Sequence, residues 1–107
     1  MMLNQIVLVG RVANEMEIKE VENKKLVTLT LAVPRSYKNA DGVYDTDFIK
    51  CTLWNSMAEN TAEYVKKGDL VGIKGRLQTE EINGFSITNV IAEKVTFLSS
   101  SRSNSEV

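Results

Sequence analysis

Apolar and polar positions alternate along residues 26–33, as expected for a β-strand with one buried face. Its apolar positions are Val27, Leu29, Leu31 and Val33. Residues 47–54 show the same period, with Ile49, Cys51 and Leu53 on the core face. The opposite face of this second strand is mixed, since it carries Phe48, Lys50, Thr52 and Trp54. Residues 4–12 are apolar on both faces, which indicates a strand central in its sheet or covered by a partner chain.

One segment has the period of a helix. Its spacing is set by four side chains: Met57, Thr61, Tyr64 and Val65. Ser56 and Glu59 have the spacing of a capping box, with Ser56 at the N-cap. Gly68 follows two lysines and is a typical stop signal. The sequence therefore predicts a helix that starts at Ser56 and ends before Gly68.

The remaining segments predict strands and turns. Residues 14–25 fit an edge strand with a turn at 22–24. Residues 34–46 predict a loop, because Pro34 ends the strand before it and the residues that follow are typical of turns. Residues 69–79 predict a strand with Gly72 and Gly75 at a bend or bulge. Its inward side chains are expected to be Val71, Ile73 and Leu77, with Lys74 and Arg76 on the other face. Asn83-Gly84 predicts a hairpin turn before a last strand at 85–98.

The order of elements is three strands, one helix and two strands. This order predicts an all-β OB-fold, a five-stranded Greek-key barrel with the helix between strands three and four. The pattern alone also allows another α+β arrangement. We expect one domain, residues 1–98, followed by a polar and disordered tail, residues 99–107.

Composition narrows the possible chemistry. The chain has 107 residues, a net charge of −1, no histidine and one cysteine, so a zinc site is excluded and the commonest general base is missing. No apolar run approaches the roughly 18 residues of a membrane span. The N-terminus lacks a secretory signal, and a cytoplasmic protein with Cys51 as a small hydrophobe is expected. The acidic residues cluster in turns, so we predict neither an enzyme nor a cofactor.

Aromatic rings alternate with cations over residues 35–54. Tyr37 lies between Arg35 and Lys38, and Lys50 lies between Phe48 and Trp54. Rings of this kind stack on bases and cations follow phosphates, so the pattern favours single-stranded nucleic acid. Two alternatives remain at this point. The rings can belong to a core or interface, and the same face of an OB-fold binds oligosaccharides in other proteins.

Several stretches together resemble a bacterial single-stranded DNA-binding protein: "NQIVLVGRV", "LTLAVPRSYKN", "DFIKCTLWNSMAENTAEYVKKGDLVGIKGRLQT" and "VIAEKVTFL". The resemblance covers residues 3–98 and is strongest to the short Gram-positive, phage or mobile-element forms. It implies a homotetramer that binds single-stranded DNA without sequence preference in replication, recombination and repair. By motif position it implies stacking by Tyr37, Phe48 and Trp54. It also implies backbone contacts from Arg11, Arg35, Lys38, Lys50, Lys66, Lys67, Lys74 and Arg76.

Three departures from the family pattern stand out. Glu80, Glu81 and Ile82 replace basic residues and an aromatic, so a stacking platform is lost there and the carboxylates repel phosphate. Pro34 replaces an asparagine. "SSSRSNSEV" replaces a long tail with an acidic tip, which puts recruitment of repair proteins in doubt. The near-neutral charge and the two glutamates favour a rival function, a protein-interaction module on the same fold such as a primosomal accessory subunit.

Overall fold

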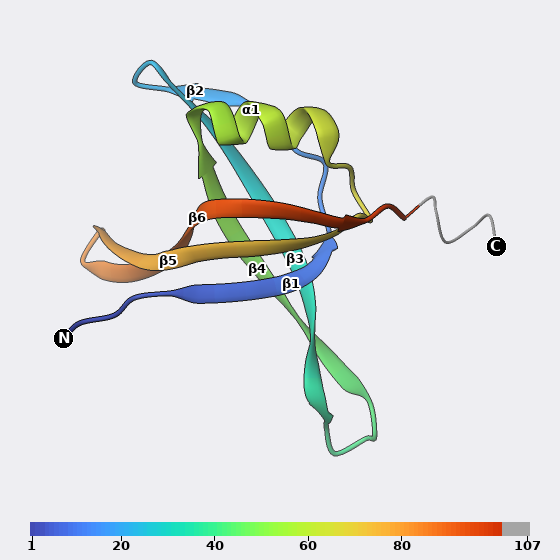
Figure 1. Cartoon of the computed structure of the whole chain (residues 1–107). Coiled ribbons are helices and arrows are strands. Elements are labelled where there is room, and N and C mark those ends of the chain that lie inside the picture. The colour runs from blue at the N-terminus through green and yellow to red at the C-terminus, as the bar shows by residue number, and fades with distance from the viewer. Residues whose placement is uncertain (102–107) are drawn as a thin grey trace.

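The computed structural model describes residues 1–101, which form six strands and one helix (Figure 1). In chain order these are β1 (Ile6–Val12), β2 (Lys19–Val21), β3 (Lys24–Lys38), β4 (Tyr44–Trp54), α1 (Asn55–Tyr64), β5 (Leu70–Ile82) and β6 (Phe85–Ser99). The first residues of the predicted tail are among the described ones. Strand β6 ends at Ser99, and the Ser101 N–H donates to Asp69 Oδ1 at 3.2 Å. Residues 102–107, the rest of that tail, lie outside the described residues.

Five of the strands close into a barrel in the order β1-β5-β6-β4-β3. The ring closes where Arg11 and Val12 of β1 pair with Ala32 and Leu31 of β3. Neighbouring barrel strands are antiparallel except β4 and β6, which run parallel at the Cys51–Val90 pair. This arrangement, with α1 between β4 and β5, is the predicted OB-fold. The count differs by one because the short β2 pairs separately with β3.

The predicted alternation is confirmed at the centre of the barrel. The largest fully buried side chains come from β3, β4 and β5: Val27, Leu29, Leu31, Cys51, Leu53, Val71 and Ile73. Helix α1 adds Ala58 and Thr61 to this core. Burial raises the pKa of the Cys51 thiol to about 11, so this cysteine behaves as the small hydrophobe that the sequence predicts.

The predicted loop at residues 34–46 is wrong. Strand β3 continues through Pro34, which pairs with Thr46, and ends at Lys38 opposite Tyr44. A proline fits here because β4 is the sole neighbour of β3 in the described pairings at this point, so one edge of the strand is open. The real turn is short and is held by Asn39, whose Oδ1 accepts hydrogen bonds from the N–H groups of residues 41 and 43.

The predicted start of the helix is wrong, whereas its end does lie before Gly68. Helix α1 begins at Asn55, and its N-cap is Trp54 without a side-chain hydrogen bond, so Ser56 does not form the expected capping box. The helix ends at Tyr64, well before Gly68. Gly68 instead uses its φ of +95° in the turn towards β5, where its N–H donates to the Val12 carbonyl at 2.8 Å.

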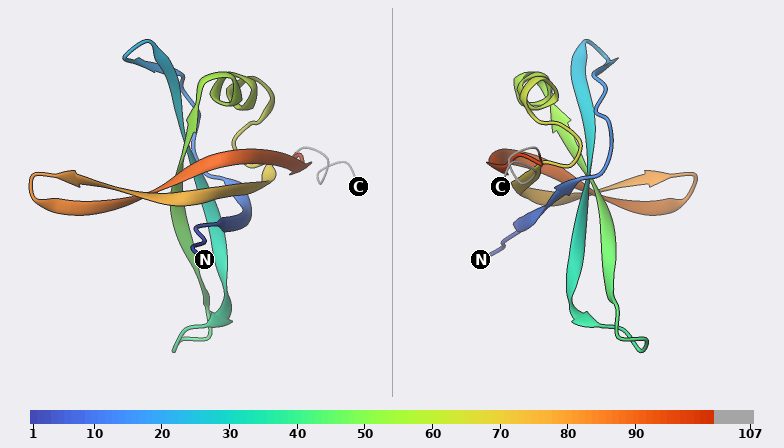
Figure 2. Two further views of the ribbon diagram at one scale, coloured as in Figure 1. Left: turned by 60° about the vertical axis from the view of Figure 1, so that its left-hand side comes forward. Right: turned by 90° about the vertical axis from the view of Figure 1, so that its right-hand side faces the viewer.

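Leu77 does not face the core as predicted, since its side chain is 42% exposed. The ladder between β5 and β6 shifts register between Lys74 and Gly75, which confirms the predicted bulge. Beyond the Leu77–Val90 pair the two strands leave the barrel as a long hairpin (Figure 2), and residues 78–88 of this hairpin are exposed. The predicted Asn83-Gly84 turn closes this hairpin with φ values of +51° and +81°.

The bulge supplies a stability test. A Cβ on Gly75 would overlap the carbonyl oxygen of Ile91, whereas a Cβ on Gly72 would meet nothing closer than 3.9 Å. Because backbone cannot give way as a side chain can, we expect Gly75→Ala to lower the free energy of unfolding by about 1–3 kcal/mol or more. Gly72→Ala is the matched control and should change it by less than about 1 kcal/mol. Equal effects in urea unfolding would contradict the described backbone approach.

Candidate nucleic-acid interface

The mixed face of β4 lies outside the barrel. Its side chains pair across the ladder with those of β3: Phe48 with Ala32, Lys50 with Thr30, Thr52 with Thr28 and Trp54 with Leu26. The Phe48 ring is 67% exposed and Trp54 is half-buried. The interpretation of Phe48 as a monomer core residue is therefore excluded, and its ring stands on the outer face of the β3–β4 ladder.

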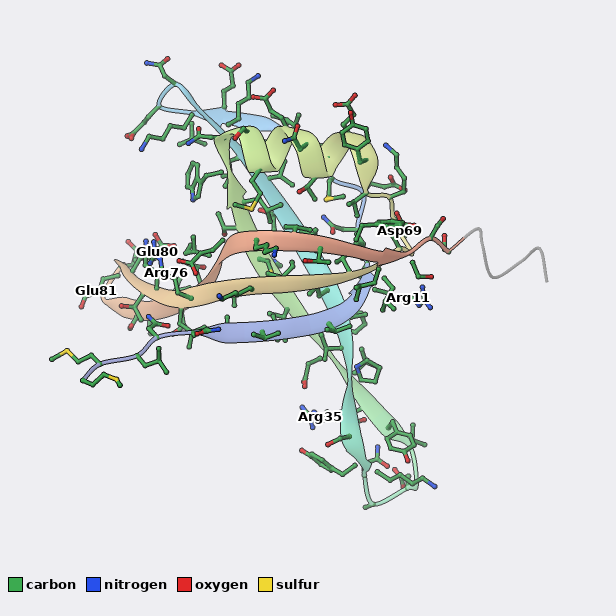
Figure 3. The ribbon with its side chains drawn as sticks, in the orientation of Figure 1. Arg11, Arg35, Asp69, Arg76, Glu80 and Glu81 are labelled. Atoms are coloured by element: carbon green, nitrogen blue, oxygen red, sulfur yellow. The ribbon has the colours of Figure 1, made fainter. Side chains whose placement is uncertain are left out.

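A groove of about 280 Å³ runs beside Trp54 and is called the Trp54 groove below. One wall comes from β3 and β4, and the other comes from the β5–β6 hairpin. Its lining residues are Leu26, Thr28, Thr52, Trp54, Gln78, Glu80, Asn89 and Ile91. In Figure 3, Glu80 and Arg76 mark the hairpin side of this region. An indole, hydroxyls, amides and a carboxylate therefore meet in one open concavity.

Polar side chains on the hairpin wall hold each other in place. Arg76 Nη1 donates to Gln78 Oε1 at 2.8 Å, and its Nε lies 3.8 Å from Glu93 Oε2. Asn89 Nδ2 donates to Glu80 Oε1 at 2.9 Å. The Glu80 carboxylate, which lines the groove, is therefore held by Asn89.

The outer half of the β3–β4 ladder, residues 34–46, forms a second projection, the β3–β4 arm (Figures 1 and 2). Tyr37 is 63% exposed there, and the Lys38 ammonium lies 5.7 Å from the centre of the Tyr44 ring. Tyr37 and Lys38 are thus accessible, and Tyr44 joins them although the sequence did not assign it to the site.

Arg35 is engaged within the arm. Its Nη2 donates to Asp47 Oδ1 at 2.9 Å, its Nε lies 3.2 Å from both oxygens, and its Nη1 lies 3.8 Å from Asp45 Oδ2. The hydrogen bond from Arg35 holds the pKa of the Asp47 carboxyl below its usual value, and the pKa of Arg35 is raised in turn. Since Asp47 and Phe48 are adjacent in β4, this ion pair lies on the opposite face from the Phe48 ring.

Three predicted cations lie elsewhere. Arg11 Nη1 donates to the Gly68 carbonyl at 3.0 Å, and Lys66 Nζ donates to the Glu63 carbonyl at 2.9 Å. Lys67 lines the same region with Lys66 and Asp69. Figure 3 places Arg11 and Asp69 at the barrel end of the β5–β6 hairpin, away from Glu80.

Lys74 is in a third place. It pairs with Val7 of β1 and with Lys94 of β6, so its side chain stands on the outer face of the barrel beside Val7. Phe48, Lys50 and Trp54 thus share the outer face of β4, and Arg76 contacts Gln78 at the edge of the Trp54 groove. Tyr37 and Lys38 lie on the arm, and the other predicted contacts lie elsewhere.

The far wall of the groove was missed by sequence reasoning. Gln78 and Asn89 face each other across the β5–β6 ladder and line the Trp54 groove. The Asn83-Gly84 turn contains the signal that could have found them, because a two-residue hairpin fixes the partner of each residue. The turn does not determine how closely that hairpin approaches Trp54.

A closed OB barrel with uncovered aromatic rings and cations beside a groove defines a class of protein, the oligonucleotide- and oligosaccharide-binding barrels. Within that class, the chain belongs to the single-strand binding protein family, whose profile matches residues 3–98. Proteins of this family bind rather than catalyse, in agreement with the prediction that the chain is not an enzyme.

Three curated relatives show how far the similarity extends. The chain is 44% identical over 103 residues to single-stranded DNA-binding protein B of Bacillus subtilis, covering 91% of each protein. It is 43% identical over 103 residues to the single-stranded DNA-binding protein of Bacillus cereus, covering 91% of this chain and 61% of that one. It is 40% identical over 111 residues to single-stranded DNA-binding protein 3 of Streptococcus agalactiae, covering 98% and 80%. The chain thus spans about three fifths of the Bacillus cereus relative and nearly all of the Bacillus subtilis one.

The described residues offer neither a metal site nor a membrane-spanning helix. Residues 1–101 contain no group of histidine, cysteine, aspartate and glutamate side chains arranged to hold a metal ion. The helix in this part of the chain is neither long nor apolar enough to cross a membrane.

The Arg35–Asp47 pair gives a test of the arm. A carboxyl with a depressed folded-state pKa adds stability above its unfolded pKa, and this stability is lost as pH falls through the folded value. Arg35→Ala should therefore raise the Asp47 pKa measured by carboxyl NMR titration and flatten the acid-side fall in stability. Lys38→Ala removes a charge from the same arm without touching Asp47 and should leave that pKa in place. An unchanged Asp47 pKa in Arg35→Ala would refute the pairing.

Proposed function

We propose that this chain binds single-stranded DNA with no required sequence, by stacking bases on exposed aromatic rings and holding phosphates with lysine and arginine. The observation that supports the proposal most is the uncovered face of β4, where Phe48, Lys50 and Trp54 stand in one row outside the barrel. The names of the relatives point to the same ligand. The biological setting implied by the family is replication, recombination and repair in the cytoplasm.

The energetics favour stacking over bulk charge. A chain with a net charge of −1 draws little attraction from its overall field. Each base stacked on an aromatic ring contributes roughly 1–3 kcal/mol, whatever its identity. Lys50 adds local positive charge on the same face, and Lys38 does so on the arm. Tyr37, Phe48 and Trp54 are therefore the main binding residues, with Arg76 at the hairpin wall as a further phosphate contact.

The predicted contacts far from this surface take a secondary place. Lys66, Lys67 and Arg11 form a basic region near Asp69, at the other end of the barrel from Glu80. The Arg35 guanidinium is bound to Asp47, so binding a phosphate instead would break this ion pair. Lys74 stands beside an apolar surface and contributes least.

That apolar surface supports the proposed homo-oligomer. Val7 and Val9 of β1 are 64% and 50% exposed, and a Cβ on Gly72 would lie 3.9 Å from both Val9 and Leu98. β1 pairs with β5 along one edge, and its other edge pairs with β3 at Arg11 and Val12. Residues 6–10 thus leave an edge open to a second copy. We propose a homotetramer in which this face supplies one of the contacts.

Trp54 is the first residue to test. Oligo(dT) should quench its fluorescence, and Trp54→Ala should weaken binding by about 1–3 kcal/mol because one stacked base is lost. Tyr64→Ala is the matched control, since Tyr64 is an exposed ring at the end of α1 outside the groove. Unquenched fluorescence and equal affinity of both variants would favour the protein-interaction module, for which the Glu80 carboxylate in the groove is the supporting feature.

The oligomer has its own test. Val9→Lys places a charge in the proposed contact and should reduce the mass measured by light scattering, because a buried unpaired charge is strongly disfavoured. Val21→Lys changes an exposed valine of β2, away from the contact, and should leave the mass unchanged. A wild-type monomer, or a Val9→Lys protein of unchanged mass, would contradict the proposal.

A further inference from the structure

Glu80 has a position that its charge alone does not explain. Its carboxylate lines the Trp54 groove, where a stacked base and its phosphate would approach. A negative charge in this place repels phosphate. No lysine or arginine of the described residues forms a salt bridge with it. Whatever favourable contact Glu80 makes with DNA must therefore come from hydrogen-bond donors on the bases.

The carboxylate is oriented for such a contact. Asn89 Nδ2 donates to Oε1 at 2.9 Å, and Oε2 accepts no hydrogen bond from the described residues. Each carboxylate oxygen has more than one acceptor site, so both oxygens can still receive donors. Gln78 and Thr52 line the groove beside it, and Trp54 offers the ring on which a base would lie.

The four bases differ in what their pairing edges offer to a carboxylate. Guanine presents two adjacent donors, N1–H and the N2 amino group, which match two carboxylate oxygens. Cytosine and adenine present one amino group next to a ring nitrogen that is an acceptor. Thymine presents one N–H between two carbonyl oxygens, which the carboxylate repels. If a base stacks on Trp54 within reach of Glu80, its pairing edge decides how well the carboxylate holds it, and guanine offers the best match.

We propose that Glu80 gives the Trp54 groove a preference for guanine over bases that lack its paired donors. The inference depends on the proposed DNA binding and refines it, since stacking still accepts every base. A good contact between a side chain and a base edge discriminates by about 5-fold or more. Because several rings bind at once, this preference acts at one position of an otherwise tolerant path.

The test compares two oligonucleotides that differ in one chemical group. Alternating (dG-dT) and (dI-dT) repeats of equal length are titrated by anisotropy in lithium salt, which does not support G-quartets. Inosine keeps N1–H and lacks the N2 amino group. We expect the wild-type protein to bind the guanine repeat about 5-fold more tightly. Glu80→Gln keeps the shape and the contact with Asn89 but loses the charged acceptor pair, so the ratio should fall towards 1.

Glu81→Gln is the matched control. It removes the same charge from the same hairpin, but Glu81 pairs with Ser86 and its side chain lies on the face opposite to Glu80. Its guanine-to-inosine ratio should equal that of the wild type. Comparing ratios cancels any intrinsic difference in stacking between guanine and inosine.

Each outcome decides the matter. If Glu80→Gln tightens both oligonucleotides equally and keeps the wild-type ratio, Glu80 acts through charge alone and the guanine preference is overturned. The same holds if Glu81→Gln changes the ratio as much as Glu80→Gln. If the wild-type protein binds neither oligonucleotide, the proposed function fails together with this inference. Thermal unfolding of each variant verifies that it is folded.

Discussion

Every strand of a closed barrel has one face inside and one face outside. In β4 this constraint is strict, because Cys51 and Leu53 are fully buried and fix the register of the strand against β3. A slip by one residue would bury Lys50 and expose the core positions. The inner side chains thus force Phe48 and Trp54 outward, and the exposed surface follows from the same hydrophobic burial that stabilises the fold.

The projecting hairpins turn that exposed surface into a concave one. The bulge at Gly75 lets β5 and β6 leave the barrel, and the two strands then form the far wall of the Trp54 groove. The β3–β4 arm extends the ring-bearing surface in another direction (Figure 2). Outside the barrel these arms have no core, so polar contacts such as Asn89–Glu80 and Arg35–Asp47 order their side chains.

Sequence periodicity predicts the parts of this structure that one strand determines by itself. The sequence therefore predicts the inward face of β4, the position of α1 and the Asn83-Gly84 turn. It does not predict the β3–β4 arm, because Pro34 and the following turn residues are local stop signals, whereas the ladder depends on pairing with β4. Leu77 failed for a related reason, since alternation continues past the point where the core ends.

In the candidate site, too, the features set by local sequence could be predicted and those set by contacts between strands could not. The rings of β4 and the arm could be selected from the sequence and from the family resemblance. The partner of Arg35 could not, because Asp47 lies on the neighbouring strand and opposite Val33 rather than Arg35. The far groove wall depends on how residues 78 and 89 approach Trp54 in three dimensions. Motif transfer also could not separate Lys66 and Arg11 from the groove, since matching positions do not reveal which surface they share.

Photocrosslinking tests the central claim most directly. An oligonucleotide that carries 5-iodouracil, irradiated in complex with the wild-type protein and digested for mass spectrometry, marks the rings on which its bases lie. The outer face of β4 and the arm predict crosslinks at Trp54, Phe48 or Tyr37. Crosslinks confined to Tyr64 and Phe97, at the other end of the barrel, would contradict the account.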